Sequence, residues 1–134
     1  MEVLRDETVA IQTAEDVVRV RRMVREWALS LGFSLVDQTK IVTAASELAR
    51  NTVVHGGGGA LAMAKLRTAN CRGLRLTFED HGPGIDNVER AMRDGFSSKG
   101  GLGLGLGGAK RLSSEFEIFS RPGNGTRVSI TRWR

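Results

Sequence analysis

The sequence predicts an α+β fold in which helices pack on one face of a mixed β-sheet. Segments with alternating apolar residues stand at both ends of the chain and in its middle, and segments with apolar residues at three- and four-residue steps lie between them. The resulting order is a strand, two helices, a strand hairpin, a helical stretch and two closing strands, which suits helices on one side of a sheet. A chain of 134 residues is long enough for one domain, so we expect residues 1–134 to form a single unit.

The first strand and helix are predicted by a change of apolar period near residue 12. Residues Val3 to Ile11 alternate loosely, as in a strand, and Thr13 stands where a helix cap is expected, followed by acids that complement the helix dipole. The apolar residues then recur along one helix face up to Gly32, which ends the helix. That face comprises Val17, Val20, Val24, Trp27 and Leu31.

A second helix is predicted from about Ser34 to His55, with its buried stripe at Ile41, Ala45 and Leu48. The four glycines that follow His55 end it. The next alternating segments predict a strand hairpin with a turn around Asn70–Gly73. Its two strands are Ala60–Thr68 and Leu74–Glu79.

The last third of the chain is rich in glycine and polar residues between short apolar runs. We expect a short helix, a mobile polar loop, a third helix, and two closing strands around a Pro-Gly-Asn-Gly turn. These elements are predicted at Asn87–Met92, Asp94–Gly101, Gly103–Leu112, Glu115–Ser120 and Thr126–Trp133.

Composition excludes several classes of protein. The net charge of +5 is spread over scattered arginines, the densest group lies on a helix that also carries acids, and tyrosine is absent, so nucleic-acid binding is disfavoured. A basic domain that holds an anionic ligand, or that docks on an acidic protein, fits the charge equally well. One cysteine and two histidines exclude a cysteine-rich zinc site. No apolar run reaches the length of a membrane span or resembles a signal peptide, so we expect a soluble cytoplasmic protein without membrane contact.

Glu47 and Asn51 form the first candidate group, because residues four apart share one face of a helix. A carboxylate and an amide oxygen one turn apart can hold Mg²⁺ and polarise a hydroxyl beside a phosphate. Taken alone, a charged helix face in contact with solvent explains the pair more simply.

The second candidate group is Asp80-His-Gly82-Pro-Gly84-Ile85, at the end of an apolar strand. Glycines at this position allow positive φ and a close approach of the backbone to a ligand. A strand-end aspartate can accept a hydrogen bond from an exocyclic amine such as that of adenine. A tight turn with a capping aspartate explains the same residues without a ligand.

The third candidate group is a glycine-rich segment, because seven of the chain's 17 glycines fall between Gly95 and Gly108. Glycines at alternate positions expose backbone N–H groups at the start of a helix, which is typical of a phosphate cradle. The alternating leucines argue against a flexible linker. A dinucleotide fingerprint is excluded because no strand immediately precedes Gly103, and a Walker A loop is excluded because no Gly-Lys pair occurs in the chain.

Together these three groups resemble the motifs of the GHKL (Bergerat-fold) ATPases, which include histidine kinases, gyrase, Hsp90 and MutL. Glu47-x-x-x-Asn51 resembles the N box, Asp80-x-Gly82-x-Gly84 the G1 box, and Gly101–Gly107 the G2 box; Gly125-Thr126 resembles the late Gly-Thr pair. The resemblance implies a two-layer α/β sandwich with a mixed, mainly antiparallel sheet. The short chain is most similar to the anti-sigma regulatory serine/threonine kinases, and in particular to the switch kinases of stressosomes.

The resemblance implies a role for each matching residue. Glu47 would be the general base, and Asn51 would coordinate Mg²⁺. Asp80 would recognise the adenine amine. The remaining nucleotide-binding residues would be Gly82, Gly84, Ile85 and Thr126 around the base, and Lys99, Gly101, Leu102, Gly103, Leu104 and Gly105 around the phosphates. The pair His55-Gly56 matches the family, which implies no role for it. The four glycines after His55 differ from the family, whose members carry bulkier polar residues in this region, which borders the hairpin and the local partner surface.

The family resemblance further implies ATP and Mg²⁺ as cofactors and a partner-switching pathway. The substrates would be STAS-domain antagonist or scaffold proteins, and a PP2C-type phosphatase would be regulated. Two alternatives remain: a non-catalytic binding module that uses nucleotide as a switch, and a catalytic fragment of a histidine kinase. The carboxylate of Glu47 favours the enzyme, since a pure switch needs no base.

Overall fold

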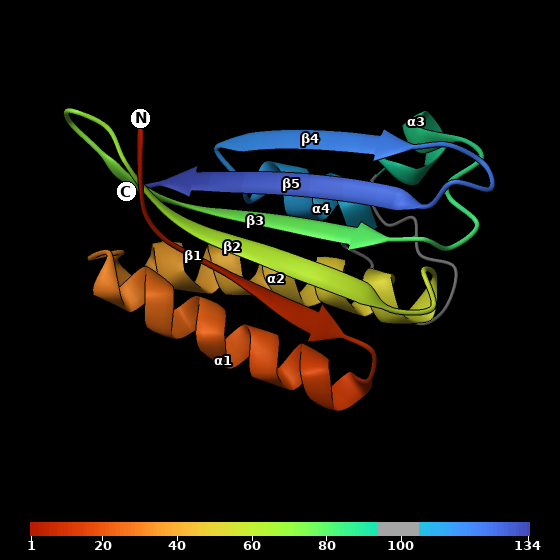
Figure 1. Cartoon of the computed structure of the whole chain (residues 1–134). Coiled ribbons are helices and arrows are strands. Elements are labelled where there is room, and N and C mark those ends of the chain that lie inside the picture. Colours follow the sequence, from red (N-terminus) through yellow and green to blue (C-terminus); the bar gives the residue numbers. More distant parts are fainter. Residues whose placement is uncertain (94–104) are drawn as a thin grey trace.

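A computed structural model describes residues 1–93 and 105–134 of the chain. Its helices and strands follow the predicted order (Figure 1). They are β1 (Glu2–Ile11), α1 (Ala14–Ser30), α2 (Leu35–Val54), β2 (Gly59–Arg67), β3 (Arg72–Asp80), α3 (Val88–Ala91), α4 (Gly105–Arg111), β4 (Glu115–Ser120) and β5 (Thr126–Trp133). The predicted Asp94–Gly101 loop and the first two residues of the predicted third helix lie outside the described residues.

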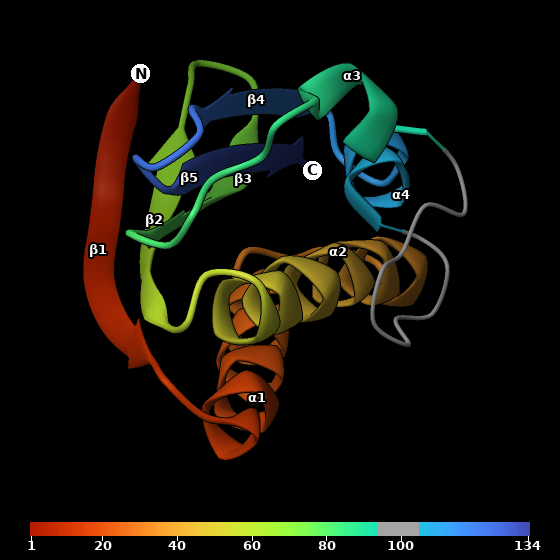
Figure 2. The same ribbon diagram turned by 90° about the vertical axis from the view of Figure 1, so that its right-hand side faces the viewer.

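The strands form one five-stranded sheet in the order β1-β2-β3-β5-β4. Figure 2 shows α1, α2 and α4 on one side of this sheet, which confirms the predicted α+β fold with helices on one face. Within the described residues every strand pairing is antiparallel rather than mixed. For β1 and β2 the reason is that α1 and α2 run in opposite directions, so the chain returns to the end of the sheet where β1 ended and enters β2 antiparallel to it (Figure 1).

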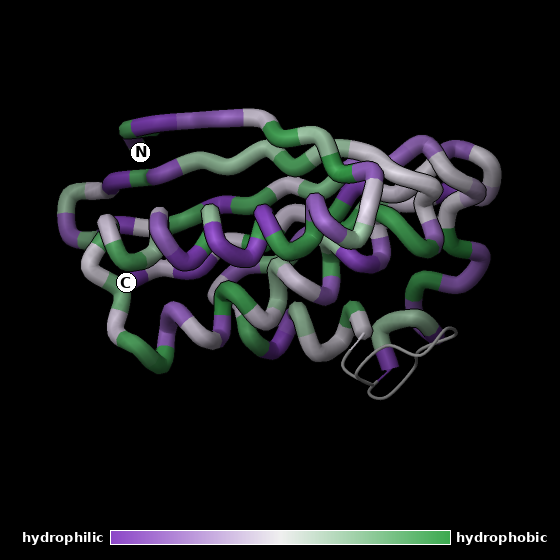
Figure 3. The backbone as a smooth tube through the Cα atoms, turned by 90° about the horizontal axis from the view of Figure 1, so that it is seen from below, coloured by the Kyte–Doolittle hydropathy of each residue, from purple (hydrophilic) through white to green (hydrophobic). Residues whose placement is uncertain are grey.

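The helix starts follow from capping side chains that the sequence displays. Thr13 caps α1 in a complete capping box, in which its hydroxyl accepts from the Asp16 backbone N–H and the Asp16 carboxylate accepts from the Thr13 N–H. Ser34 caps α2 in the same way by accepting from the Asp37 backbone N–H at 3.1 Å. Hydrophilic and hydrophobic residues then alternate around both helices, as the colours in Figure 3 show.

The core lies between the sheet and the inner faces of α1 and α2, and it is mainly aliphatic. The predicted stripes are confirmed: Ile41, Ala45 and Leu48 are all buried, and of the five residues in the first stripe only Val17 is partly exposed. The sheet contributes alternate residues of its inner face. The largest fully buried side chains are Ile11, Val20, Val24, Ile41, Leu48, Leu61, Met63, Leu66, Leu74, Leu76 and Ile130. No helix in the described ranges is long and apolar enough to cross a membrane.

At one end of the molecule, charged side chains tie the layers together. Arg132 of β5 donates to the Asp37 carboxylate of α2 at 2.7 Å and to the Leu112 carbonyl at 2.8 Å. Near the end of α1, the cations of Arg5 and Lys65 lie over the Trp27 ring, 4.6 and 5.2 Å from its centroid. Desolvation by burial, and secondarily the nearby Arg5, lower the pKa of Lys65.

Candidate active site

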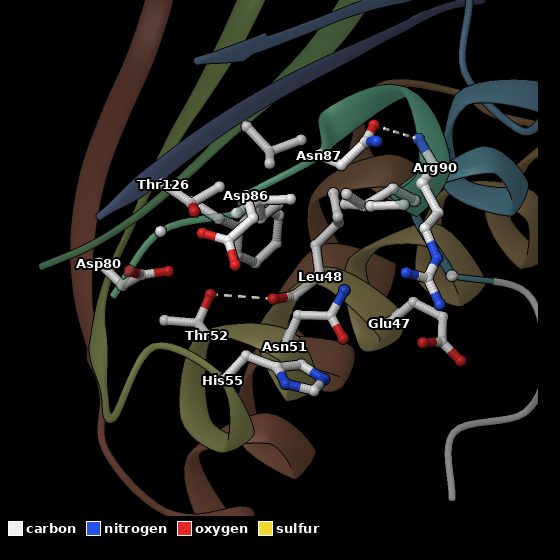
Figure 4. A pocket seen from close by; sticks show the side chains of 17 residues that line it. Glu47, Leu48, Asn51, Thr52, His55, Asp80, Asp86, Asn87, Arg90 and Thr126 are labelled. Carbon is white, nitrogen blue, oxygen red and sulfur yellow. Dashed lines mark hydrogen bonds between the residues drawn. The ribbon is translucent and has the colours of Figure 1, made fainter. Parts of the chain in front are cut away.

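A pocket of about 410 Å³ opens at the other end of the molecule, where α2 ends beside the tip of β3 and the start of β5. Helices α3 and α4 border its other side (Figure 4). Its floor is apolar and its rim is polar, as is common for a small-molecule site. The lining residues are Glu47, Leu48, Asn51, Thr52, His55, Phe78, Asp80, Gly84, Ile85, Asp86, Asn87, Arg90, Ala91, Gly105, Leu106, Thr126 and Val128.

Helix α2 brings Glu47 and Asn51 to the pocket one turn apart, as their spacing predicts. Glu47 is only 4% exposed, and Ala44, one turn earlier on this face, is fully buried. The simpler explanation, a charged helix face in solvent, is therefore wrong for Glu47. Helix α4 packs on α2 and covers this face, so the carboxylate lies in a sheltered cavity.

The tip of β3 places the Asp80 carboxylate in the pocket, where Figure 4 shows it opposite Asn51 and His55. One of its oxygens accepts the Gly82 backbone N–H at 2.9 Å. The carboxylate also lies against Gly56, where an added Cβ would stand 2.4 Å from the Asp80 Cγ. Gly56 therefore leaves the space that the Asp80 side chain occupies, which gives the His55-Gly56 pair a structural role beyond ending the helix.

The loop that follows Asp80 is fixed by close backbone contacts. Gly84 has a φ of +77°, and a Cβ there would stand 2.1 Å from the Arg121 carbonyl oxygen. Only glycine fits this position without a shift of the backbone. The Gly123 N–H donates to the Pro83 carbonyl at 2.7 Å, so the loop is held against the β4–β5 turn.

Most residues predicted for the site that are described meet at this one pocket. Glu47, Asn51, Asp80, Gly84, Ile85, Gly105 and Thr126 all line it. Gly82 does not line it; its N–H orients Asp80, and it packs against Gly56, where a Cβ would stand 2.8 Å from the Gly56 Cα. Lys99, Gly101, Leu102, Gly103 and Leu104 lie outside the described residues.

Sequence reasoning did not assign several pocket residues. The apolar ones are Leu48, Phe78, Ala91, Leu106 and Val128, and the polar ones are Thr52, His55, Asp86, Asn87 and Arg90. Asn87 caps α3 by accepting the Arg90 N–H at 2.9 Å, and in Figure 4 the Arg90 guanidinium points toward Glu47. The short helix expected at Asn87–Met92 contains Asn87 and Arg90, but no role at the site was predicted for either residue.

The described side chains fit a magnesium ion that is held mainly by a nucleotide. No cluster of three or more His, Cys, Asp or Glu that could hold a metal occurs among the residues the structure describes. Mg²⁺ at phosphate sites usually takes one or two protein oxygens, and phosphates and waters supply the rest. The Asn51 amide oxygen beside the buried Glu47 carboxylate provides such a partial donor set.

The fold combines a sheet that has helices on one face, a pocket at the end of the second helix and a carboxylate at the tip of the third strand. Together these features define a class of nucleotide-binding domains. A family model for the histidine kinase-like ATPase domain matches residues 11–132. The chain therefore belongs to the histidine kinase-like ATPase domain family, and ATP is the nucleotide that such a domain uses.

The relatives place the chain more narrowly within this family. It is 44% identical over 125 residues to the serine/threonine-protein kinase RsbT of Bacillus subtilis, covering 93% of this chain and 94% of RsbT. It is 30% identical to the anti-sigma F factor of a Thermoanaerobacter species, covering 84% of this chain and 82% of that one. A solved structure of the RsbU and RsbW domains of a Mycobacterium tuberculosis protein is similar, with a TM-score of 0.66, 25% identity and coverage of 97% of this chain and 33% of that one. These relatives confirm the expected kinase class related to anti-sigma regulators.

Proposed function

We propose that this chain is a Mg²⁺- and ATP-dependent protein serine/threonine kinase of a partner-switching pathway. The observation that carries the proposal is the buried Glu47 carboxylate, 4% exposed, inside the same pocket as Asn51 and Asp80. A carboxylate beside a nucleotide site can orient an incoming hydroxyl and accept its proton during phosphoryl transfer. The 44% identity to RsbT, which is named a serine/threonine-protein kinase, supports the same conclusion.

In this proposal Asp80 and Thr126, opposite each other on β3 and β5, hold the adenine. The apolar floor, including Phe78 and Val128, would contact the faces of the ring. Asn51 would hold Mg²⁺, which offsets the charge of the phosphates when it is bound. Gly105, with Lys99 and the glycines and leucines from Gly101 to Leu104, would bind the phosphates.

Glu47 would act on the incoming substrate hydroxyl. The hydroxyl oxygen bonds to the γ-phosphorus of ATP while the bond from that phosphorus to the β–γ bridging oxygen breaks. The hydroxyl proton passes to the Glu47 carboxylate, and ADP is the leaving group.

We propose STAS-domain antagonist or scaffold proteins as the substrates and a PP2C-type phosphatase as the regulated partner. The relatives named for RsbT, RsbU, RsbW and anti-sigma F factor support a partner-switching pathway of this kind. The test is incubation of the purified chain with γ-labelled ATP, Mg²⁺ and a purified STAS-domain protein. Label on a serine or threonine of the partner is expected, and its loss in Glu47→Gln would assign the transfer to this pocket.

A non-catalytic nucleotide switch is the second candidate, because other relatives are named anti-sigma factors. In that case nucleotide would change the affinity of the chain for its partner without transfer of phosphate. The labelled-ATP experiment separates the two: nucleotide-dependent complex formation with an unlabelled partner would support the switch and contradict the kinase.

A further inference from the structure

Arg90, on the short helix α3, is the only lysine or arginine among the described residues that line the pocket. Its backbone N–H donates to the Asn87 side chain at 2.9 Å, and its neighbour Ala91 is buried in the core. Arg90 itself is exposed, and its guanidinium extends from α3 toward Glu47 (Figure 4). The helix therefore presents a permanent cation to the pocket, where a ligand can reach it.

The other titratable side chains of the described lining are mainly acidic. Besides Arg90 and His55 they are three carboxylic acids, Glu47, Asp80 and Asp86. A triphosphate in this pocket would add further negative charge, and a bound Mg²⁺ offsets only part of it. A fixed cation on the protein is then needed close to the phosphates, and Arg90 is placed to supply it.

The two ends of the pocket differ, and the difference gives a bound nucleotide its direction. Asp80 and Thr126, which are proposed to hold the adenine, lie at one end, and Glu47 and Arg90 lie at the other (Figure 4). A nucleotide whose base is held at the first end extends its phosphates toward the second. The γ-phosphate is the group furthest from the base, so it comes nearest to Arg90 and Glu47.

The proposed transfer brings two anions together, because the Glu47 carboxylate and the γ-phosphate act on the same hydroxyl. A cation beside both of them offsets their repulsion. A guanidinium carries five N–H donors in a planar fork, so it can contact a carboxylate and a phosphate at the same time. The direction of the Arg90 side chain, from α3 toward Glu47, suits such a bridge.

We propose that Arg90 contacts the γ-phosphate of ATP beside Glu47 and thereby distinguishes ATP from ADP. This inference rests on the proposed nucleotide function of the pocket. It makes Arg90 a catalytic residue, since the guanidinium touches the phosphoryl group that is transferred. It also adds a phosphate contact from α3, which lies outside the glycine-rich segment and outside the other motifs of the sequence.

The test is calorimetric titration of the full chain with ATP and with ADP, each with Mg²⁺ and without a protein substrate. In Arg90→Gln, ATP affinity should fall by about tenfold or more, the scale of a lost hydrogen bond between charged groups. ADP affinity should change little, because ADP lacks the phosphate that Arg90 contacts. An unchanged ratio of ATP to ADP affinity would overturn the proposal, and would do so even if transfer to a partner were lost.

Arg93→Gln is the matched control. It removes the same charge from an exposed arginine three residues further along, which does not line the pocket. This variant should keep the wild-type ratio of the two affinities. If the ratio fell as much as in Arg90→Gln, the effect would come from the general positive potential of this region, and the direct contact would be overturned.

Further outcomes separate this inference from the proposed function. Circular dichroism without nucleotide would establish that each variant is folded; if Arg90→Gln is not, Arg90→Met takes its place under the same criteria, because it also removes the charge and keeps a long side chain. Absence of ATP binding in the wild type would overturn the proposed function, and this inference with it. ATP binding by the wild type, with the same ratio in the Arg90 variant, would overturn this inference alone.

Discussion

The two ends of helix α2 are held in different ways. At its N-terminal end Ser34 caps the helix, Gln38 donates to the Phe33 carbonyl at 2.9 Å, and Asp37 bonds to Arg132. At its C-terminal end Glu47 and Asn51 face a cavity instead. One helix therefore carries stabilising contacts at one end and the proposed chemistry at the other. Substitutions at the two ends should separate stability from function.

The largest effect is expected from Glu47→Gln, at the functional end. Phosphoryl transfer to a partner should fall by about 10²- to 10⁴-fold, the contribution of a general base. ATP affinity should stay close to that of the wild type, since the amide keeps the shape of the side chain. Single-turnover transfer assays and calorimetry would measure the two quantities, and undiminished transfer would remove Glu47 from the mechanism.

Asp80→Asn should have the next largest effect, on nucleotide binding. The loss of a charged hydrogen bond costs about 1.5–3 kcal/mol, or roughly 10- to 100-fold in ATP affinity. Thermal unfolding without nucleotide should change little, because the amide oxygen can still accept the Gly82 N–H. Titration with ATP and Mg²⁺ measures the affinity; equal affinity in variant and wild type would contradict the adenine assignment.

On the neighbouring helix, Thr13→Ala tests the capping box of α1. Loss of the cap should lower the free energy of unfolding by about 1 kcal/mol. ATP affinity should be unaffected, because Thr13 does not line the pocket. Urea denaturation followed by circular dichroism would measure the change. A loss of ATP affinity at full stability would contradict a purely structural role for this cap.

The smallest effect, and one that depends on pH, is expected from Asp37→Asn. The hydrogen bond from Arg132 is the main cause that lowers the pKa of Asp37 below its ordinary value of 3.8. A depressed folded-state pKa stabilises the fold above the ordinary pKa, and this stabilisation is lost as the pH falls through the folded-state value. The wild type should therefore be more stable than Asp37→Asn at pH 7, by at most about 1 kcal/mol.

Melting temperatures measured from pH 7 down to pH 2 would test this. The difference between wild type and Asp37→Asn should shrink below about pH 4, where the unfolded-state carboxyl begins to bind its proton. If the difference in melting temperature stayed constant through this pH range, the ion pair between Asp37 and Arg132 would be excluded as its source.

The sequence predicted the elements well because local signals mark their ends. The capping residues Thr13, Ser34 and Asn87 all stand where helices begin, and β4 and β5 have the predicted bounds. Helical spacing also placed Glu47 and Asn51 on one face. What spacing could not give was the burial of Glu47, since that depends on how distant segments, α3 and α4 among them, pack around the pocket.

Contacts between segments that are distant in the sequence explain the features of the site that the sequence did not predict. Gly56 and Gly82 pack backbone to backbone, which no local pattern of either segment indicates. The place of Arg90 in the pocket depends on how α3 packs beside it, and that of Thr126 on a strand order that places β5 next to β3. Motifs identified the ligand-facing residues, and tertiary structure was needed to find the residues that orient them.

The distribution of tryptophan has a practical optical consequence. The chain has two tryptophans and no tyrosine. Trp27 lies under Arg5 and Lys65, and Trp133 donates to the Glu115 carboxylate and packs on Gly73, at the start of β3. Neither lines the pocket at the opposite tip of that strand. Tryptophan fluorescence should therefore report unfolding with little quenching by bound nucleotide. The stabilisation of the fold by a ligand can then be measured from this fluorescence without a correction for quenching by the ligand.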